Sequence, residues 1–247
     1  MESLAVHAKN LLNIELTAIQ LEAFQIYYTE MLAWNERTNL TGITDYQEVQ
    51  VKHFLDALTL ASPTLRGEAV STVFDISEVA LIDIGAGAGF PGLPLKLLYP
   101  KMRLTLVDSV GKKTAFLSHL VGKLRLEGVT VLTGRAEDLG QQQAHRERYN
   151  MATGRAVANL AVLAEYCLPL CKVGGLFVAP KKGQLDKEIT LAQPAIKLLG
   201  GELRQTPTFE FEPETHDQRQ LLVVDKIAPT PSAYPRRAGL PAKRPIT

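Results

Sequence analysis

Apolar residues in the first part of the chain recur at the spacing of amphipathic helices. Between residues 17 and 35 they fall every three or four positions, as one face of a helix requires. Thr17 and Gln20 stand at the start of this pattern at the spacing of a capping box. A second amphipathic segment covers residues 46–60. We therefore predict an N-terminal helical cap over residues 1–65.

From residue 80 onward, short apolar runs alternate with amphipathic segments. This alternation predicts an α/β domain over residues 66–228, with a mostly parallel sheet covered by helices on both faces. The runs 207–212 and 220–227, joined by an acidic loop at 213–217, predict a late antiparallel pair. The predicted parallel strands are 80–84, 103–107, 129–133, 150–153 and 175–180, and the predicted helices are 91–99, 111–126, 157–171 and 184–199.

The composition fits one such domain with small additions. The chain has 247 residues, of which 46% are hydrophobic. It contains no apolar stretch of membrane-span length, no secretory signal and no cluster of metal-ligating residues. Its two cysteines, Cys167 and Cys171, fall inside the predicted helix 157–171, where reduced and packed thiols are expected. We therefore expect a cytoplasmic protein that binds neither a membrane nor a metal. The sequence carries no clear signal of oligomerisation, and we expect a monomer.

Charge is distributed unevenly, although the net charge is only +1. Residues 1–50 carry two bases and seven acids, a net of −5, whereas residues 101–125 carry six bases and one acid, a net of +5. The tail 229–247 adds four bases and five prolines without an acid. Such a basic footprint is what contact with nucleic-acid phosphates requires. We predict that the tail is an extended arm, disordered alone and ordered on RNA, because its composition cannot build a core.

A glycine-rich loop links the first predicted strand to the helix that follows. After an acid, every second position is a glycine: Gly85, Gly87 and Gly89. Glycines let the backbone approach a ligand closely, and the N-terminus of the following helix offers free N–H groups. The pattern Asp-x-Gly-x-Gly-x-Gly, which begins at Asp83, resembles the loop of S-adenosylmethionine-dependent methyltransferases. A dinucleotide fingerprint is disfavoured, because Phe90 stands where its third glycine is needed.

Two further acids follow the next predicted strands. In open α/β sheets, ligands bind outside the carboxyl ends of the strands, and there Asp108 is placed to accept both hydroxyls of a ribose. This geometry serves NAD and S-adenosylmethionine alike, so Asp108 predicts a nucleoside without saying which. In the loop 134–138, an acidic side chain such as Glu137 is placed to hold an adenine amino group.

The loop after the fourth predicted strand reads Gly154-Arg155-Ala156 and lies where a methyl acceptor would bind. It lacks the Asp/Asn-Pro-Pro-Tyr/Phe motif of many amino methyltransferases, and no cysteine stands at a predicted strand end for a covalent route. An acceptor with its own lone pair, such as a purine N7, needs neither device. We expect Arg155 to contact the donor's carboxylate or the acceptor's phosphate or base, and positioning to matter more than a general base.

Taken together, these motifs resemble those of the bacterial 16S ribosomal RNA guanine-N7 methyltransferases, the glucose-inhibited division protein B family. The resemblance covers nearly the whole chain and implies a Rossmann-like class I methyltransferase fold. It is carried by residues 34–41, 53–56, 83–94, 108–109, 112–113, 134–137, 155–156, 182–183 and 234–245.

The resemblance also implies a cofactor, a substrate and their binding residues. The implied cofactor is S-adenosyl-L-methionine, and the implied substrate is N7 of a guanine, guanine 527, in the 16S ribosomal RNA of the small ribosomal subunit. The implied cofactor-binding residues are Gly85, Gly87, Gly89, Phe90, Asp108, Ser109, Val110, Ala136, Glu137 and Arg155. Arg155, Asn39, His53 and Asp56 are expected to orient the acceptor, positions 53 and 56 sharing one face of a helix. RNA-binding candidates are Lys112, Lys113, Arg236 and Arg237.

Three alternatives stay open at this point. A nicotinamide-dependent oxidoreductase would share the fold, but Phe90 in place of the third glycine argues against it. A non-enzymatic RNA-binding factor would have lost donor binding, whereas the glycine loop and Asp108 are intact. A methyltransferase for another RNA, a protein or a small molecule would fit the same donor site. The basic segment 101–125 and the tail favour RNA.

Overall fold

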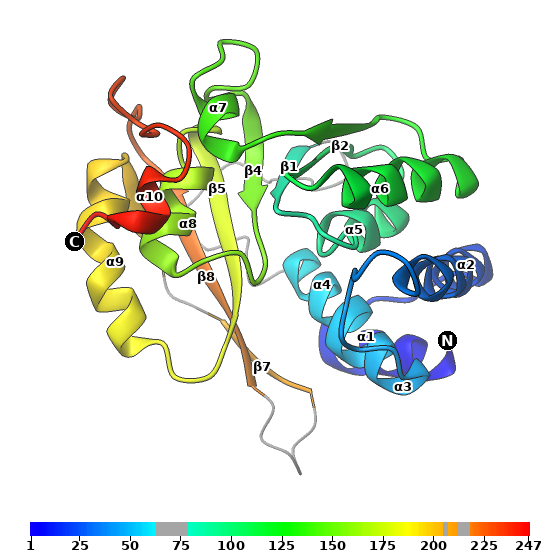
Figure 1. Ribbon diagram of the computed structural model, residues 1–247. Coiled ribbons are helices and arrows are strands. Elements are labelled where there is room, and N and C mark those ends of the chain that lie inside the picture. The colour runs from blue at the N-terminus through cyan, green and yellow to red at the C-terminus, as the bar shows by residue number, and fades with distance from the viewer. Residues whose placement is uncertain (63–78, 205–206, 212–217) are drawn as a thin grey trace.

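The computed structural model describes residues 1–62, 79–204, 207–211 and 218–247 (Figure 1). Its strands are β1 (Ala80–Ile84), β2 (Arg103–Asp108), β3 (Val129–Thr133), β4 (Tyr149–Thr153), β5 (Cys171–Lys182), β6 (Gly201–Leu203), β7 (Thr208–Glu210) and β8 (Gln218–Lys226). They form one sheet with the order β3-β2-β1-β4-β5-β8-β6, and β7 pairs with β8. The pairs among β1 to β5 are parallel, whereas β8 is antiparallel to β5, β6 and β7.

This topology confirms the predicted α/β class and the late antiparallel pair. The order of the strands reverses at β1, which has β2 on one side and β4 on the other. In open α/β sheets, ligands bind at such a switch point, outside the carboxyl ends of the strands. The glycine loop after β1 and the loop that holds Arg155 after β4 therefore lie at the same edge of the sheet.

Helices cover both faces of the sheet (Figure 1). They are α1 (Glu2–Leu12), α2 (Ala18–Asn35), α3 (Tyr46–Val49), η1 (Gln50–Leu55), α4 (Asp56–Leu58), η2 (Thr59–Ala61), α5 (Gly92–Leu98), α6 (Gly111–Lys123), α7 (Ala136–Gly140), α8 (Leu160–Cys167), α9 (Asp186–Leu198) and α10 (Leu240–Lys243). Side chains alternate along β1, so Leu81 joins the core under α5 and α6, whereas Ile82 and Ile84 join the core under α8 and α9.

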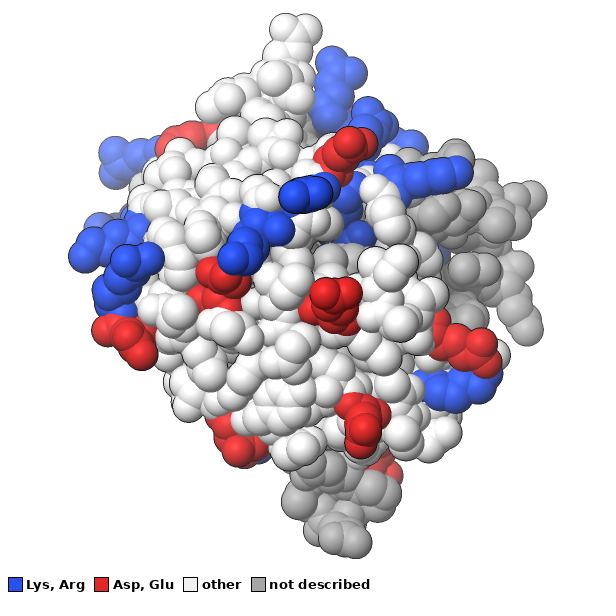
Figure 2. All heavy atoms as spheres, turned by 90° about the vertical axis from the view of Figure 1, so that its right-hand side faces the viewer, with Lys and Arg blue, Asp and Glu red and all other residues white. Residues whose placement is uncertain are grey.

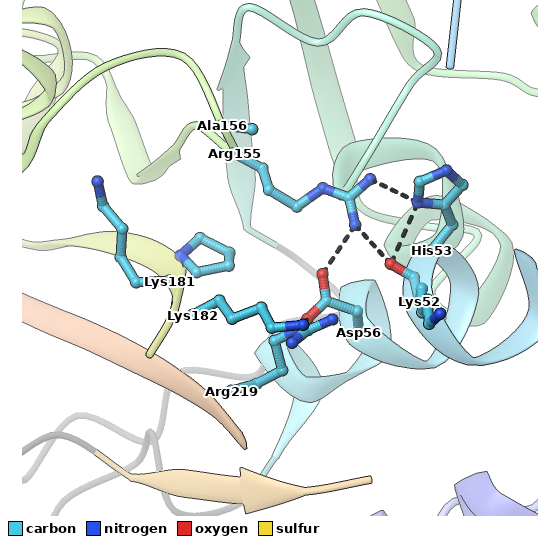
Figure 3. A pocket seen from close by; sticks show the side chains of 9 residues that line it. Lys52, His53, Asp56, Arg155, Ala156, Lys181, Lys182 and Arg219 are labelled. Atoms are coloured by element: carbon cyan, nitrogen blue, oxygen red, sulfur yellow. Dashed lines mark hydrogen bonds and ion pairs between the residues drawn. The ribbon is translucent and has the colours of Figure 1, made fainter. Parts of the chain in front are cut away.

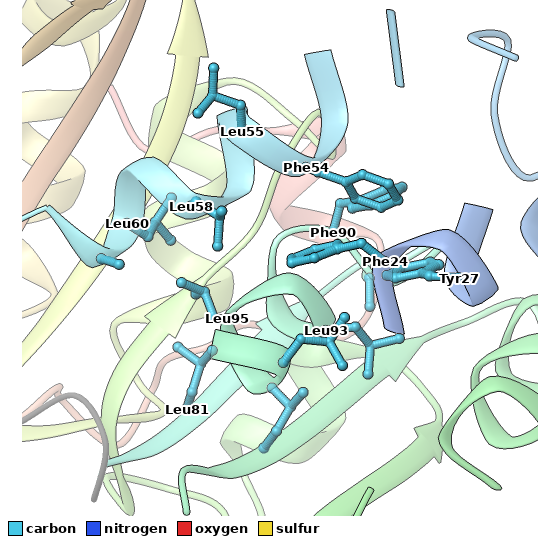
Figure 4. Close-up of a cluster of buried hydrophobic side chains, with 14 of the residues drawn as sticks. Phe24, Tyr27, Phe54, Leu55, Leu58, Leu60, Leu81, Phe90, Leu93 and Leu95 are labelled. Atoms are coloured by element: carbon cyan, nitrogen blue, oxygen red, sulfur yellow. The ribbon is translucent and has the colours of Figure 1, made fainter. Parts of the chain in front are cut away.

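In the part of the N-terminal cap that the structure describes, aromatic side chains pack directly on the glycine loop and share its core. Phe24 and Phe54 lie with their ring centroids 4.9 Å apart. Tyr27 stacks on Phe90 of the loop at 5.2 Å, and its hydroxyl donates to the carbonyl of Ala88 (Figure 4). These contacts join the cap to the same apolar core as α5 and α6, which fixes its position beside the loop.

The predicted start of α2 is confirmed. The Thr17 hydroxyl accepts from the N–H of Gln20 at 3.3 Å, and the Gln20 side chain accepts from the N–H of Thr17 at 2.9 Å. The predicted boundary between cap and domain at residues 65–66 lies outside the described residues, and so does the acidic loop 213–217.

The predicted helix 157–171 needs a correction, because Cys171 does not belong to it. Asn159 caps α8, and the helix ends at Cys167, two residues before Pro169. Proline disfavours helical geometry in the residue before it and lacks the N–H that a helix needs. Cys171 instead opens β5, and both cysteines are buried with free thiols.

The C-terminal tail is docked on the domain, which corrects the prediction of an extended arm. Arg146 donates to the carbonyls of Tyr234 at 2.6 Å and Thr230 at 2.7 Å. Arg236 forms an ion pair with Glu165 at 2.6 Å. Composition could not reveal these anchors, because they are polar contacts with residues far away in the sequence.

The uneven distribution of charge along the sequence leads to an uneven distribution of charge on the surface. In the view of Figure 2, Lys and Arg predominate in the upper half, and Asp and Glu predominate in the centre and the lower half. The upper half is at the height of α6 in Figure 1, and the lower half is at the height of the acidic N-terminal helices. Within the described residues, no helix is both long and apolar enough to span a membrane.

Candidate active site

The glycine loop adopts backbone angles that favour glycine. Gly85 has a φ of +67° and Gly89 a φ of +98°. A Cβ on Gly85 would lie 2.5 Å from Cγ2 of Val157, and a Cβ on Gly89 would lie 2.5 Å from Cδ1 of Leu93. The chain thus needs glycine here both for the turn and for close packing.

Asp108 ends β2 and fixes the neighbouring backbone. Its Oδ2 accepts from the N–H of Gly87 at 2.9 Å, and its Oδ1 accepts from the N–H of Val110 at 2.9 Å. The side chain is buried, and each carboxylate oxygen keeps a second lone pair for a ligand. Asp108 therefore holds the glycine loop and borders the cleft at the same time.

A cavity of about 260 Å³ opens at the carboxyl ends of β1 and β2. Its lining includes these predicted donor residues: Gly85, Asp108, Ser109, Ala136 and Glu137. The other predicted donor residues do not line it: Gly87, Gly89, Phe90, Val110 and Arg155. Val157, Tyr166 and Ala242 also line the cavity, and the sequence pattern did not single them out. The size and the acidic groups of this cavity suit a nucleoside.

Asp83 lies beneath the glycine loop rather than in the cavity. Its Oδ2 accepts from the N–H of Gly92 at 2.9 Å, whereas its Oδ1 is buried without a hydrogen-bond partner. Burial raises the pKa of Asp83 to about 7. This carboxyl group therefore anchors the start of α5 and retains its proton well above the usual range.

Arg155 is the centre of a cluster that joins the loop after β4 to the cap (Figure 3). Its Nη1 donates to Oδ2 of Asp56 at 2.7 Å and to the carbonyl of Lys52 at 3.2 Å. Its Nη2 lies 3.2 Å from Nδ1 of His53. Its guanidinium carbon lies 4.9 Å from the ring centroid of Phe90. Three of the residues predicted to orient the acceptor, Arg155, His53 and Asp56, therefore meet at one place.

A π-helical turn brings His53 and Asp56 to this place. The amphipathic segment predicted at 46–60 is helical, but between Gln50 and Leu55 its turns widen. The N–H of Asp56 donates to the carbonyl of Val51, five residues earlier. Single π-helical turns occur often at functional sites, because they redirect side chains without breaking the helix.

Burial, together with the Arg155 and Arg219 guanidiniums, lowers the pKa of His53 to about 4. The ring stacks on Phe90 with centroids 4.6 Å apart, and its Nε2 lies 2.8 Å from the Thr41 hydroxyl. His53 is therefore neutral at pH 7, and it is held in place by a ring contact and a hydrogen bond.

Arg219 is a member of the cluster that the sequence analysis missed. It belongs to β8, and its Nε lies 3.2 Å from Oδ1 of Asp56, so Asp56 has a guanidinium on each oxygen. An arginine two residues before the apolar run 221–224 is the only signal that could have marked it. The contact between Arg219 and Asp56 could not be predicted from the sequence, because the two positions lie far apart in the chain.

A second cavity of about 300 Å³ opens beside this cluster. It is lined by Lys52, His53, Asp56, Arg155, Ala156, Pro180, Lys181, Lys182 and Arg219. Five of these side chains are cationic and one is acidic, so the cavity favours an anion.

The loop 155–158 borders both cavities. Arg155 and Ala156 line the cationic cavity, whereas Val157 and Ala158 line the cavity with Asp108. Ala156 has a φ of +56°, which is uncommon for a residue with a side chain. This sharp bend lets neighbouring residues of one loop line two cavities.

The remaining predicted site residues lie outside both cavities. Asn39 is exposed in the loop after α2. Lys112 is exposed and Lys113 is half-buried in the first turn of α6. Arg237 is exposed, whereas Arg236 is engaged by buried Glu165. In the ranges that the structure describes, no three His, Cys, Asp or Glu residues are grouped to hold a metal ion.

Comparison with known proteins gives long, closely similar relatives. The family model described as rRNA small subunit methyltransferase G matches residues 20–221. The ribosomal RNA small subunit methyltransferase G of Roseiflexus castenholzii is 51% identical over 227 residues, which are 92% of each chain. The protein of the same name from Dehalococcoides mccartyi is 44% identical over 241 residues, which are 98% of each chain.

Solved structures agree on the fold. M. jannaschii TYW2 in complex with AdoMet matches with a TM-score of 0.51 at 11% identity, covering 62% of this chain and 72% of that one. MtNAS in complex with MTA and tNA matches with a TM-score of 0.52 at 14% identity, covering 83% and 71%. At such low identity these likenesses show a class I methyltransferase fold and nothing further.

The relatives decide between the alternatives that the sequence left open. Their identity and coverage exclude a nicotinamide-dependent oxidoreductase and a non-enzymatic factor, and they favour an enzyme that acts on ribosomal RNA. The match of the family model, the relatives and the shared fold lead to one conclusion: this chain belongs to the rRNA small subunit methyltransferase G family.

Proposed function

We propose that the protein transfers a methyl group from S-adenosylmethionine to N7 of a guanine in 16S ribosomal RNA. The loop 155–158 carries this proposal, because it joins a cavity suited to a nucleoside to a cavity suited to an anionic nucleic acid. The family supports the reaction, and the resemblance of the motifs implies position 527.

The residues of the first cavity fit the donor. Asp108 stands at the carboxyl end of β2, where its free lone pairs can accept the ribose hydroxyls. Glu137 lines the same cavity and can accept from the adenine amino group. Val157, packed against Gly85, supplies an apolar wall. When bound, S-adenosylmethionine supplies a methyl group activated by the positive charge of its sulfur.

The second cavity fits the acceptor strand. Arg155 and Arg219 present positive charge that contacts with RNA phosphates would use. Asp56 holds both guanidiniums, so we assign it a positioning role that acts on the acceptor through these arginines.

No side chain needs to remove a proton for this reaction. A guanine N7 carries its own lone pair and loses no proton before it attacks the methyl group. His53 is neutral at pH 7 and contacts Arg155, so we propose that it holds the arginine in place rather than moving a proton. The chain would then contribute positioning and electrostatic stabilisation.

We further propose that the protein works in the cytoplasm as a monomer on the small ribosomal subunit. The loop 155–158 borders both cavities, so the proposed site needs no residue from a second copy. Lys112, Lys113 and Arg237, at the surface, would contact RNA phosphates outside the cavities.

The test is to incubate the protein with tritiated S-adenosylmethionine and 30S subunits that lack N7-methylguanosine, and then to map the label. Label at a single guanine N7 is the expected result. The Asp108→Ala variant should keep its fold, by circular dichroism, and lose most of its donor affinity, by calorimetry. Donor binding without transfer would move the substrate elsewhere, and unchanged donor affinity in the variant would contradict the role of Asp108.

A further inference from the structure

The C-terminal tail reaches the cavity that we assign to the donor. Ala242 of α10 forms part of the cavity lining. The N–H of Gly239 donates to Oε1 of Glu137 at 2.8 Å, and Glu137 is only 3% exposed. The tail therefore touches the acidic side chain that faces the adenine end of the proposed donor site.

The tail is fixed to the two helices that carry this part of the wall. Arg236 donates four hydrogen bonds to the fully buried Glu165 of α8: Nη2 to Oε2 at 2.6 Å, Nε to Oε1 at 2.9 Å and to Oε2 at 3.2 Å, and backbone N–H to Oε1 at 2.8 Å. Next to α7, Gln141 donates to the carbonyl of Pro235 at 2.7 Å. A Cβ on Gly140 would lie 2.6 Å from Cγ of Pro235, so the chains pack closely there.

We propose that the docked tail, residues 235–247, is a working part of the donor site and holds Glu137 ready to receive adenine. Oε1 of Glu137 accepts from the tail, and the Tyr166 side chain is hydrogen-bonded to the same carboxylate. Each carboxylate oxygen has two lone pairs, so the group can still accept from the exocyclic amino group of the nucleoside. Ala242 closes the wall beside it. This inference rests on the proposed use of the cavity by S-adenosylmethionine.

The arrangement predicts a loss of affinity when the tail cannot dock. Without it, Glu137 would lose a hydrogen-bond donor and the cavity would open to water at its adenine end. Organising the carboxylate would then become part of the cost of binding, which weakens the affinity. It would also weaken the discrimination that a positioned acceptor exerts against ligands without the amino group.

The experiment compares three variants with the full-length protein by calorimetric titration with S-adenosylhomocysteine. The first is a chain that ends at Tyr234, and the second is Arg236→Ala. The third, Arg244→Ala, is the matched control, because this arginine of the same tail is exposed. We expect the first two to bind about tenfold or more weakly and the control to bind as tightly as the full-length chain. Thermal unfolding of each variant checks that the fold persists.

A second titration, with S-inosylhomocysteine, replaces the adenine amino group by an oxygen. The full-length chain should prefer S-adenosylhomocysteine, and the truncated chain should lose most of that preference. Equal affinities and equal preferences in all four proteins would overturn this inference alone. Absence of any binding by the full-length chain would instead overturn the proposed donor site, and this inference with it.

Discussion

At the scale of single residues, the glycines of the loop after β1 differ in how closely other atoms pack around them. Gly87 and Gly89 both have a positive φ, of +58° and +98°. The nearest atom to a Cβ on Gly87 is 3.8 Å away, whereas a Cβ on Gly89 would lie 2.6 Å from the Tyr27 hydroxyl and 2.5 Å from Leu93. The spacing of the two glycines in the sequence gives no difference between them, and only the packing around each one in the structure does.

The Gly89→Ala variant should therefore be much less stable than the Gly87→Ala variant. We expect backbone strain of about 1 kcal/mol in Gly87→Ala. We expect about 2–4 kcal/mol in Gly89→Ala, because Leu93 and Tyr27 must also move. Urea unfolding monitored by circular dichroism measures both free energies, and an equal cost would contradict the packing argument.

His53 should make stability depend on pH. Its pKa is lowered from 6.5 to about 4 in the folded state, so between these values the unfolded chain binds a proton that the folded chain does not. The contribution of neutral His53 to the free energy of unfolding is fully present above pH 6.5 and is lost as the pH falls to about 4. Its size is at most about 3 kcal/mol. The His53→Gln variant should lack this loss in chemical unfolding at pH 4–8. Parallel profiles of the two proteins would refute the assignment.

At the scale of elements, the helix 46–61 and the strand β8 are joined through one carboxylate. Asp56 faces Arg155 from the loop after β4 and Arg219 from β8, and its side chain is 5% exposed. The π-helical turn before it sets its direction. Helical periodicity predicted that His53 and Asp56 share a face, and the structure confirms that they do, but periodicity gave no indication of the widened turn.

The Asp56→Ala variant should lose both stability and methyl transfer. It leaves two guanidiniums without their carboxylate, and such losses typically cost about 3–5 kcal/mol for a buried pair. Asp56→Asn keeps one oxygen acceptor and should lose less. The control is Glu48→Ala on the same helical segment, whose partner Lys52 is part-exposed, and it should cost less than about 1 kcal/mol. A loss in Asp56→Ala no larger than that of the control would contradict the bridging role.

At the scale of the whole molecule, the topology of the sheet determines where the charged segments lie. The N-terminal helices, rich in acids, lie below α6 of the basic segment 101–125 in Figure 1, and Figure 2 shows mostly acids in the lower half and mostly bases in the upper half of the face on that side. Lys112 and Lys113 open α6, which follows the strand that ends in Asp108. The positive surface is therefore beside the cleft, where it can attract an RNA strand.

The Lys112→Ala, Lys113→Ala double variant should bind a 16S ribosomal RNA fragment less tightly and with a smaller dependence on salt. Each lost phosphate contact should reduce the slope of log K against log salt by about 1. Lys187→Ala is the control, because Lys187 is exposed on α9 at the opposite end of the sheet. An equal change in the slope for the control would contradict a localised RNA surface.

Local patterns were enough to predict much of the site. The alternation of strands and helices, the glycine loop and Asp108 depend on periodicity and on neighbours in the chain, so the sequence reveals them directly. The carboxyl ends of parallel strands meet at one edge of a sheet. For this reason the order of the strands and loops along the chain was enough to predict that Gly85, Asp108 and Glu137 border one cavity.

The sequence by itself determined the fold class, the order of the main elements and the glycine loop, because these follow from short-range periodicity and backbone preference. Only the tertiary structure decided that Arg219 meets Asp56, that Cys171 opens a strand, and that Arg236 anchors the tail to Glu165. Most of these depend on side chains that are distant in sequence and brought together by burial. A charge pattern shows how many cations a segment has, but packing decides which of them are paired inside the protein and which face the solvent.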